Sequence, residues 1–131
     1  MMALNESWQK WSPQVLSLVR IVAAACFFEY GLEKYLGFPE AGPKMNALLY
    51  VQGVIEIVGG LLLLFGAYTR IVAFILSGDM AAAYFIEHLP RSFFPAVNGG
   101  DAAVLFCFVF FYITFKGGGA WSVDRFIRNV S

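Results

Sequence analysis

The sequence predicts an all-α, polytopic membrane protein in which four transmembrane helices form an antiparallel bundle. The first observation is composition: of 131 residues, 60% are hydrophobic and only 14% are charged, whereas soluble domains carry about 25% charged residues. The second is the presence of four apolar segments of the length, about 20 residues, that a helix needs to cross about 30 Å of hydrocarbon. We therefore expect a lipid bilayer to surround the chain.

Turn residues mark where the four apolar segments end. The segments run over 13–35, 45–66, 70–89 and 96–116. Glycine and proline interrupt the chain between them, and three glycines at 117–119 follow the last, as is typical of helix ends and loops. Because the connections are short, neighbouring helices should pack antiparallel. We expect a single domain over 1–131, with an amphipathic tail at 120–131 on the membrane surface.

Basic residues predict the orientation of the spans. An even number of spans puts both chain ends on one side, which then holds five basic residues against three on the other. Because basic residues favour the cytoplasmic side, we expect a multi-pass protein of the cell membrane with both termini in the cytoplasm. The first apolar segment is too long for a signal peptide, so we expect it to be retained. The formal net charge is zero, which leaves no basic surface for nucleic acid.

Several ionisable residues fall inside the predicted spans. Arg20, Glu56 and Asp79 lie two to three helical turns from a helix end, where a charge costs about 2.5 to 3.5 kcal/mol. Such residues face the interior of a bundle. Antiparallel packing would gather further polar side chains nearer the outer surface: Glu29, Glu33, Glu87, His88, Asn98 and Asp101. We therefore predict a polar pocket that opens outward and narrows toward Glu56 and Asp79.

Glu56 is the strongest candidate for a ligand contact. It shares a helix face with Gln52, four residues earlier. Three glycines beside it leave room for a ligand: Gly53, Gly59 and Gly60. A carboxyl group at this depth can pass a proton to a reducible ring or donate a hydrogen bond to a carbonyl group. The alternative is structural, with Arg20 paired to Glu56 or Asp79 so that the charges only hold the helices in register.

The remaining chemistry-bearing residues carry weaker signals. Cys26 and Cys107 lie on different segments without a C-x-x-C motif, and we expect both to be small packing residues. The single histidine, His88, does not predict a metal site on its own. The sequence holds no flavin, haem or cluster motif, so we expect no intrinsic cofactor.

Five short features occur in a fixed order along nearly the whole chain. They are Arg20, G-L-E-K at 31–34, G-V-I-E-I-V-G-G at 53–60, N-G-G-D at 98–101 and G-G-G-A-W-S-V-D at 117–124. Together they resemble the DoxX family of small four-helix bacterial membrane proteins. The resemblance implies recurrent polar positions at Arg20, Lys34, Glu56, Asp101 and Asp124. The family more often has Glu where this chain has Asp101, and the shorter side chain reaches less far.

The resemblance to DoxX implies a role in membrane redox chemistry. Members are described as membrane subunits or partners of oxidoreductases, including a thiosulfate to quinone oxidoreductase and assemblies linked to oxidative stress. We therefore expect an accessory subunit that binds a quinone between its helices while a partner oxidoreductase subunit supplies electrons. Whether the chain is itself an enzyme stays open at this point.

The predicted ligand-binding residues come from all four segments: Arg20, Gln52, Gly53, Glu56, Gly60, Asp79 and Asp101. On this interpretation Glu56 and Asp79 are proton or hydrogen-bond partners of the ring, and Arg20 orients it electrostatically. Two alternatives remain. The pocket could bind a cationic solute in a small proton-linked carrier, or the chain could be a structural membrane anchor, as a homo-oligomer.

Overall fold

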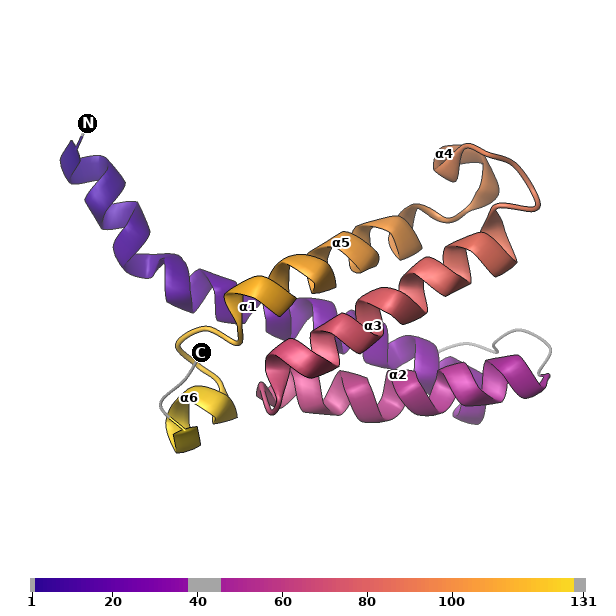
Figure 1. The fold of residues 1–131 in the computed structure, drawn as a ribbon, viewed down its shortest axis with the longest axis horizontal. Coiled ribbons are helices and arrows are strands. Elements are labelled where there is room, and N and C mark those ends of the chain that lie inside the picture. The colour runs from indigo at the N-terminus through magenta and orange to yellow at the C-terminus, as the bar shows by residue number, and fades with distance from the viewer. Residues whose placement is uncertain (1, 38–45, 129–131) are drawn as a thin grey trace.

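The computed structural model describes residues 2–37 and 46–128, and the regular structure in these ranges is helical (Figure 1). The elements are α1 (Met2–Leu36), α2 (Ala47–Phe65), α3 (Thr69–Ala83), the π-helix η1 (Tyr84–His88), α4 (Pro95–Asn98), α5 (Asp101–Lys116) and α6 (Val123–Arg128). The predicted all-α fold is confirmed.

Three of the described helices are long and apolar enough to cross a membrane. They are α1, α2 and the continuous helix formed by α3 and η1. The predicted segment 96–116 is instead divided, because Gly99 adopts a left-handed conformation (φ 76°) and ends α4. The 16 residues of α5 span about 24 Å, less than the hydrocarbon thickness of about 30 Å. The chain is thus an α-helical membrane protein with one helix shorter than expected.

Helix α1 begins earlier than predicted. The prediction placed its start at residue 13, but the helix starts at Met2 and contains Pro13. Proline removes one backbone donor and displaces the carbonyl group one turn earlier, which bends a helix without necessarily ending it. The N-terminal part of α1 bends away from the rest of the molecule (Figure 1).

The helices pack as two close antiparallel pairs. Helix α1 lies along α2 and α3 lies along α5, while α2 and α3 join the pairs. Gly31 allows the first pair to approach closely, because a Cβ atom there would lie 3.1 Å from the backbone nitrogen of Ile57. In the second pair, Ser77 Oγ donates a hydrogen bond to the Cys107 carbonyl oxygen at 2.7 Å. Close contacts therefore hold the two helices of each pair together.

Aromatic packing joins α1 to α5 across the centre. Phe27 and Phe110 are fully buried, and their rings meet edge to face with centroids 5.1 Å apart. Phe106 stacks on Phe110 with a centroid separation of 5.6 Å. Many apolar side chains point outward instead, as expected for helices that face lipid: Val19, Val22, Val54, Val58, Ile75 and Leu105.

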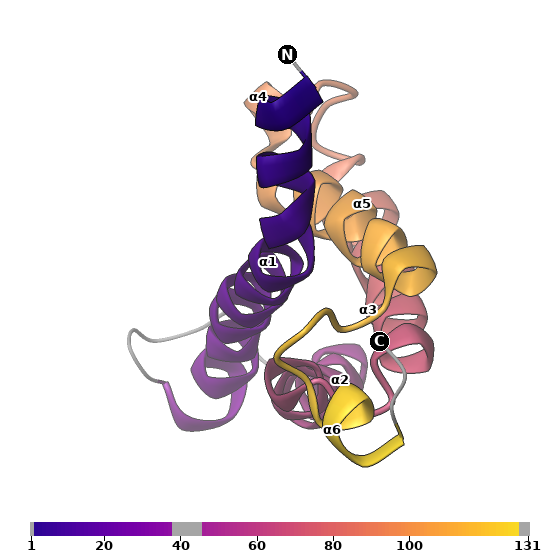
Figure 2. The ribbon, with the colours of Figure 1, turned by 90° about the vertical axis from the view of Figure 1, so that its left-hand side faces the viewer.

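The first turns of α1 and helix α6 lie at one end of the long axis (Figure 1). The segment that links α5 to α6 crosses this end of the molecule (Figure 2). The turn between α2 and α3 lies at the same end, where Gly66 ends α2 in a left-handed conformation (φ 75°). The end of α1 and the start of α5 lie at the opposite end.

Candidate functional site

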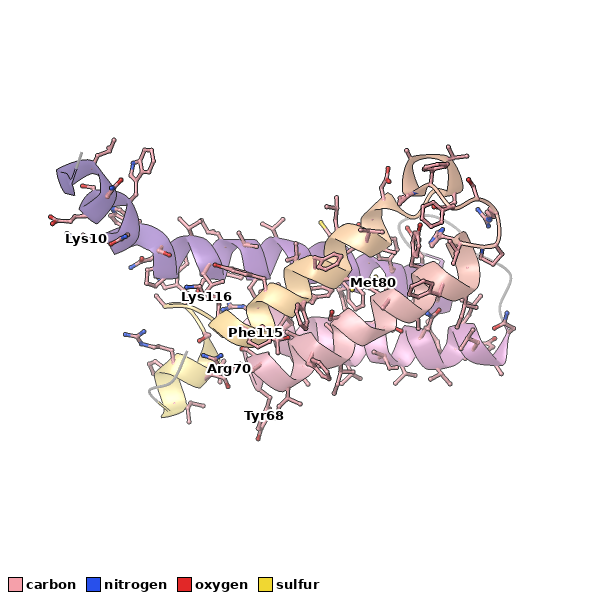
Figure 3. The ribbon with its side chains drawn as sticks, turned by 45° about the horizontal axis from the view of Figure 1, so that its top comes forward. Lys10, Tyr68, Arg70, Met80, Phe115 and Lys116 are labelled. Carbon is pink, nitrogen blue, oxygen red and sulfur yellow. The ribbon has the colours of Figure 1, made fainter. Side chains whose placement is uncertain are left out.

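A cavity of about 180 Å³ lies between α1, α2, η1 and the start of α5. We call it the acidic cavity, after its polar lining residues Tyr30, Lys34, Glu56, Glu87 and His88. Small and apolar residues complete the wall, among them Met80, which projects from α3 (Figure 3). Three of its lining residues, Glu56, Glu87 and His88, are among those that the sequence placed in a polar pocket.

Glu56 forms an ion pair with Lys34 at the bottom of this cavity. The Glu56 side chain is 1% exposed and that of Lys34 is 12% exposed, and Lys34 Nζ contacts Glu56 Oε1. The antiparallel pairing of α1 and α2 sets the two residues at the same height. The other carboxylate oxygen, Oε2, is buried and has no hydrogen-bond partner among the described residues.

A second carboxyl group lies beside the ion pair. The Gln52 side chain, one turn before Glu56 on α2, lies next to the Asp79 side chain of α3. Within residues 2–37 and 46–128, three further buried oxygens at this end lack partners: Gln52 Oε1, Asp79 Oδ2 and Glu87 Oε1. Because most buried polar atoms in proteins are hydrogen-bonded, these acceptors are candidates for contact with a donor.

The π-helix η1 supplies Glu87 and His88 to the cavity. A π-helical turn holds one more residue than an α-turn and is frequent at functional sites. His88 Nδ1 lies 3.3 Å from the carbonyl oxygen of Asn98, and the buried Asn98 side chain binds Ser92 O and Gly100 N, each at 2.8 Å. The N-G-G turn therefore fixes the rim of the cavity.

Asp101 and two of the predicted outer acids, Glu29 and Glu33, are not in the cavity wall, whereas Glu87 is. Asp101 is exposed at the start of α5, while its neighbour Ala102 lines the cavity. Glu29 is exposed and Glu33 is half-buried, and neither is among the lining residues. The structure brings Gln52, Glu56 and Asp79 together and leaves Asp101 outside.

Arg20 lies at the other end of the helices, in a network with the C-terminal segment. Its guanidinium group donates to the carbonyl oxygens of Gly118 and of Trp121, the latter at 2.8 Å. Ser17 Oγ donates to Gly118 O and accepts from Trp121 N, both at 2.9 Å. The expected pairing of Arg20 with Glu56 or Asp79 is thus wrong, because backbone carbonyl groups of a non-helical segment take its donors.

Asp124 extends this network to the start of α3. Its two carboxylate oxygens accept hydrogen bonds from the backbone amides of Tyr68 and Thr69, each at 2.8 Å. Its own amide donates to Gly66 O at 3.0 Å. A carboxylate at a helix N-terminus satisfies otherwise unpaired amides. We call Ser17, Arg20, Gly118, Trp121 and Asp124 the C-terminal clamp.

The glycines of α2 pack against neighbouring side chains. A Cβ atom at Gly60 would lie 3.2 Å from Phe28 Cβ, and one at Gly59 would lie 2.6 Å from Leu76. The ring of Tyr35 covers Gly53. These positions permit close helix packing, and the space for a ligand lies instead on the Glu56 side facing η1.

Sequence reasoning missed Lys34 as the partner of Glu56. The family resemblance singles out Lys34 as a polar position but does not relate it to the second helix. The available signal was the register of an antiparallel pair, in which residues near the end of one helix face those near the start of the next. In the described part of the chain, no three His, Cys, Asp or Glu side chains lie close enough to hold a metal ion.

Comparisons with known proteins agree with a membrane protein of one family. The DoxX family profile matches residues 15–89. A Haemophilus influenzae relative described as "Uncharacterized protein" is 44% identical over 125 residues, covering 89% of this chain and 93% of the relative. "Putative oxidoreductase CatD" of Bacillus subtilis is 27% identical over 118 residues, covering 84% of each chain.

A mycobacterial protein extends these similarities. "Uncharacterized membrane protein Rv3486" of Mycobacterium tuberculosis is 27% identical over 135 residues, covering 86% of this chain and 81% of the relative. No solved structure matches the chain significantly. The profile match covers more than half of the chain, and the apolar helices agree with it. The chain belongs to the DoxX family.

Proposed function

We propose that this protein is an accessory subunit or partner of a membrane oxidoreductase and binds a quinone-like ring in the acidic cavity. The observation that carries the proposal is the Glu56 carboxyl group. It is buried, one oxygen contacts Lys34, and the other has no partner among the residues that the structure describes, although the residue lines a cavity. The similarity to a relative named as an oxidoreductase supports the redox assignment.

The size and chemistry of the cavity suit a single ring. Its volume of about 180 Å³ exceeds the roughly 150 Å³ of a cavity that holds benzene. The Lys34 ammonium and Tyr30 hydroxyl groups can donate hydrogen bonds to ring carbonyl oxygens. Glu56 Oε2 can accept a hydrogen bond from a hydroxyl group of the reduced ring. Because Lys34 and Glu56 are in contact, they would bind the same polar edge of the ring, Lys34 in its oxidised and Glu56 in its reduced state.

We also propose that α5 crosses the membrane as a fourth helix and that both chain ends lie in the cytoplasm. Helix α5 lies along α3, and the glycines that follow it, 117–119, are buried rather than exposed to lipid. A C-terminal fluorescent-protein fusion should fluoresce, and an alkaline phosphatase fusion at the same point should be inactive. Active phosphatase would contradict this orientation.

The direct test of ligand binding is mass spectrometry of small molecules that co-purify with the protein. We expect ubiquinone or menaquinone in the wild type and about tenfold lower occupancy in Glu56→Gln, which keeps the size of the side chain but removes its charge. Glu29→Gln is the matched control, because Glu29 lies on α1 outside the cavity. Equal quinone occupancy in both variants would remove Glu56 from the site.

A liposome experiment separates the redox proposal from a carrier. Quinone-loaded protein alone should not move protons or amine cations across liposomes, whereas a carrier would do so and would lose transport in Glu56→Gln. Transport by the wild type without any bound quinone would overturn the proposed function.

A further inference from the structure

We propose that a second cavity, at the clamp end of the molecule, binds the headgroup of an anionic phospholipid. This basic cavity has a volume of about 320 Å³, and its polar lining residues are Ser12, Tyr112, Lys116 and Arg125. It lies at the opposite end from the acidic cavity, so the inference stands apart from the proposed function.

Charge in the basic cavity is unbalanced. Lys116 and Arg125 both line it, and no Asp or Glu is among its described lining residues. Neither cation forms a salt bridge with a residue that the structure describes. The nearest acid in sequence, Asp124, directs both carboxylate oxygens to the start of α3. Two cations that share a cavity repel each other, and a phosphate group between them would attract both.

The fold brings these two cations together from separate segments. Lys116 is the last residue of α5 (Figure 3), and Arg125 lies in α6 beyond the glycine run. The Ala120 amide donates to the Pro13 carbonyl oxygen at 3.1 Å, which holds the intervening segment against α1. The cavity is therefore built by the same contacts that form the C-terminal clamp.

The surroundings favour a lipid over a soluble phosphate. One wall of the cavity is apolar, formed by Pro13, Val15 and Leu16, and can hold the upper part of an acyl chain. Exposed aromatic rings surround this end, with Trp11 59% exposed and Trp121 52% exposed. Such rings mark the headgroup level of a bilayer, where basic pockets between membrane helices bind anionic headgroups.

The test is native mass spectrometry of the delipidated full chain in detergent, titrated with phosphatidylglycerol. Lys116→Gln with Arg125→Gln should weaken binding about thirtyfold, since each charge near the headgroup contributes about fivefold. Lys10→Gln with Arg91→Gln removes two exposed charges that do not line the cavity and should leave binding unchanged. Phosphatidylcholine with the same acyl chains carries no net charge and should bind weakly to all forms.

Each single variant, Lys116→Gln or Arg125→Gln, should weaken binding about fivefold, and thermal unfolding checks that the variants are folded. Equal phosphatidylglycerol binding by the double variant and the control pair would overturn the proposal. Inorganic phosphate that binds the wild type as tightly as the lipid does would also overturn it, in favour of a soluble anion.

Discussion

Buried polar groups differ in their hydrogen-bond partners between the two ends of this protein. At the clamp end, Arg20 and Asp124 are bound to backbone groups of other segments. Two atoms there, Arg20 Nε and Thr69 Oγ1, lack partners among the described residues, and neither residue lines the acidic cavity. At the cavity end, buried oxygens of four side chains lack partners in the described part of the chain: Gln52, Glu56, Asp79 and Glu87. Of these, Glu56 and Glu87 line the acidic cavity.

This difference separates the charged residues that hold the fold together from those that are candidates for ligand contacts. Both kinds belong to the polar positions of the DoxX pattern. A charge deep in a membrane is expected to be functional, and depth alone ranks Arg20 and Glu56 equally. The destination of the hydrogen bonds distinguishes them, because backbone partners indicate a fold role and unpaired acceptors beside a cavity indicate a binding role. The following predictions test that division through stability, from the largest effect to the smallest.

Arg20→Met should be the most destabilising change. It removes charged donors from the carbonyl oxygens of Gly118 and Trp121, and each such bond contributes about 1.5 to 3 kcal/mol. We expect a loss of about 3 to 6 kcal/mol in the free energy of unfolding, measured by denaturant titration in detergent. The stability of Arg20→Lys should lie between that of the wild type and that of Arg20→Met, because a single ammonium group cannot form the planar fork of hydrogen bonds. If Arg20→Met kept the stability of the wild type but lost bound quinone, Arg20 would be a ligand contact and not a structural charge.

Gly119→Ala and Gly99→Ala form a matched pair across the two ends. Both residues have left-handed backbone (φ 83° and 76°), which costs an alanine about 1 to 2 kcal/mol. A Cβ atom at Gly119 would also lie 2.6 Å from the Pro13 carbonyl oxygen, whereas nothing lies within 4 Å at Gly99. We expect the free energy of unfolding to fall by about 3 kcal/mol in Gly119→Ala and by about 1 kcal/mol in Gly99→Ala. Equal melting temperatures of Gly119→Ala and Gly99→Ala would show that the segment around Gly119 is loosely held.

Asp124→Ala should remove the cap from α3. The amides of Tyr68 and Thr69 lose their acceptor, and loss of a helix cap costs about 1 to 2 kcal/mol. Asp124→Asn keeps one acceptor oxygen and should cost about half as much. Thermal unfolding of the two variants measures the difference, and a stability gain in either would contradict the capping role.

Replacing the whole ion pair at the cavity end should leave the fold intact. Lys34→Met with Glu56→Leu removes both charges, and such replacements are neutral or stabilising. We expect between no change and a gain of about 2 kcal/mol, together with loss of bound quinone. Denaturant titration and mass spectrometry of the same sample measure both. A large stability loss would make the pair a fold element like Arg20.

The helical segments and the depth of Glu56 could be predicted from the sequence, because apolar length and a buried carboxyl group are local signals. Gln52 and Glu56 share a face by helical spacing alone, and antiparallel packing already predicted Asp79 near Glu56. The partner of Glu56 required the register between α1 and α2, which depends on how the two helices pack. The hydrogen-bond partners of Arg20 lie in a segment without regular structure, and hydrophobic periodicity carries no signal for such a segment.

The position of the C-terminal clamp also constrains the biosynthesis of the protein. Gly118, which accepts from Arg20, follows it by 98 residues, and translation adds about 5 to 20 residues per second. The charged side chain of Arg20 on α1 thus waits roughly 5 to 20 seconds for its partner. Until then the translocon, a chaperone or water must accommodate the guanidinium group. Chains truncated before residue 117 lack the Gly118 and Trp121 carbonyl groups that bind this guanidinium group in the folded protein.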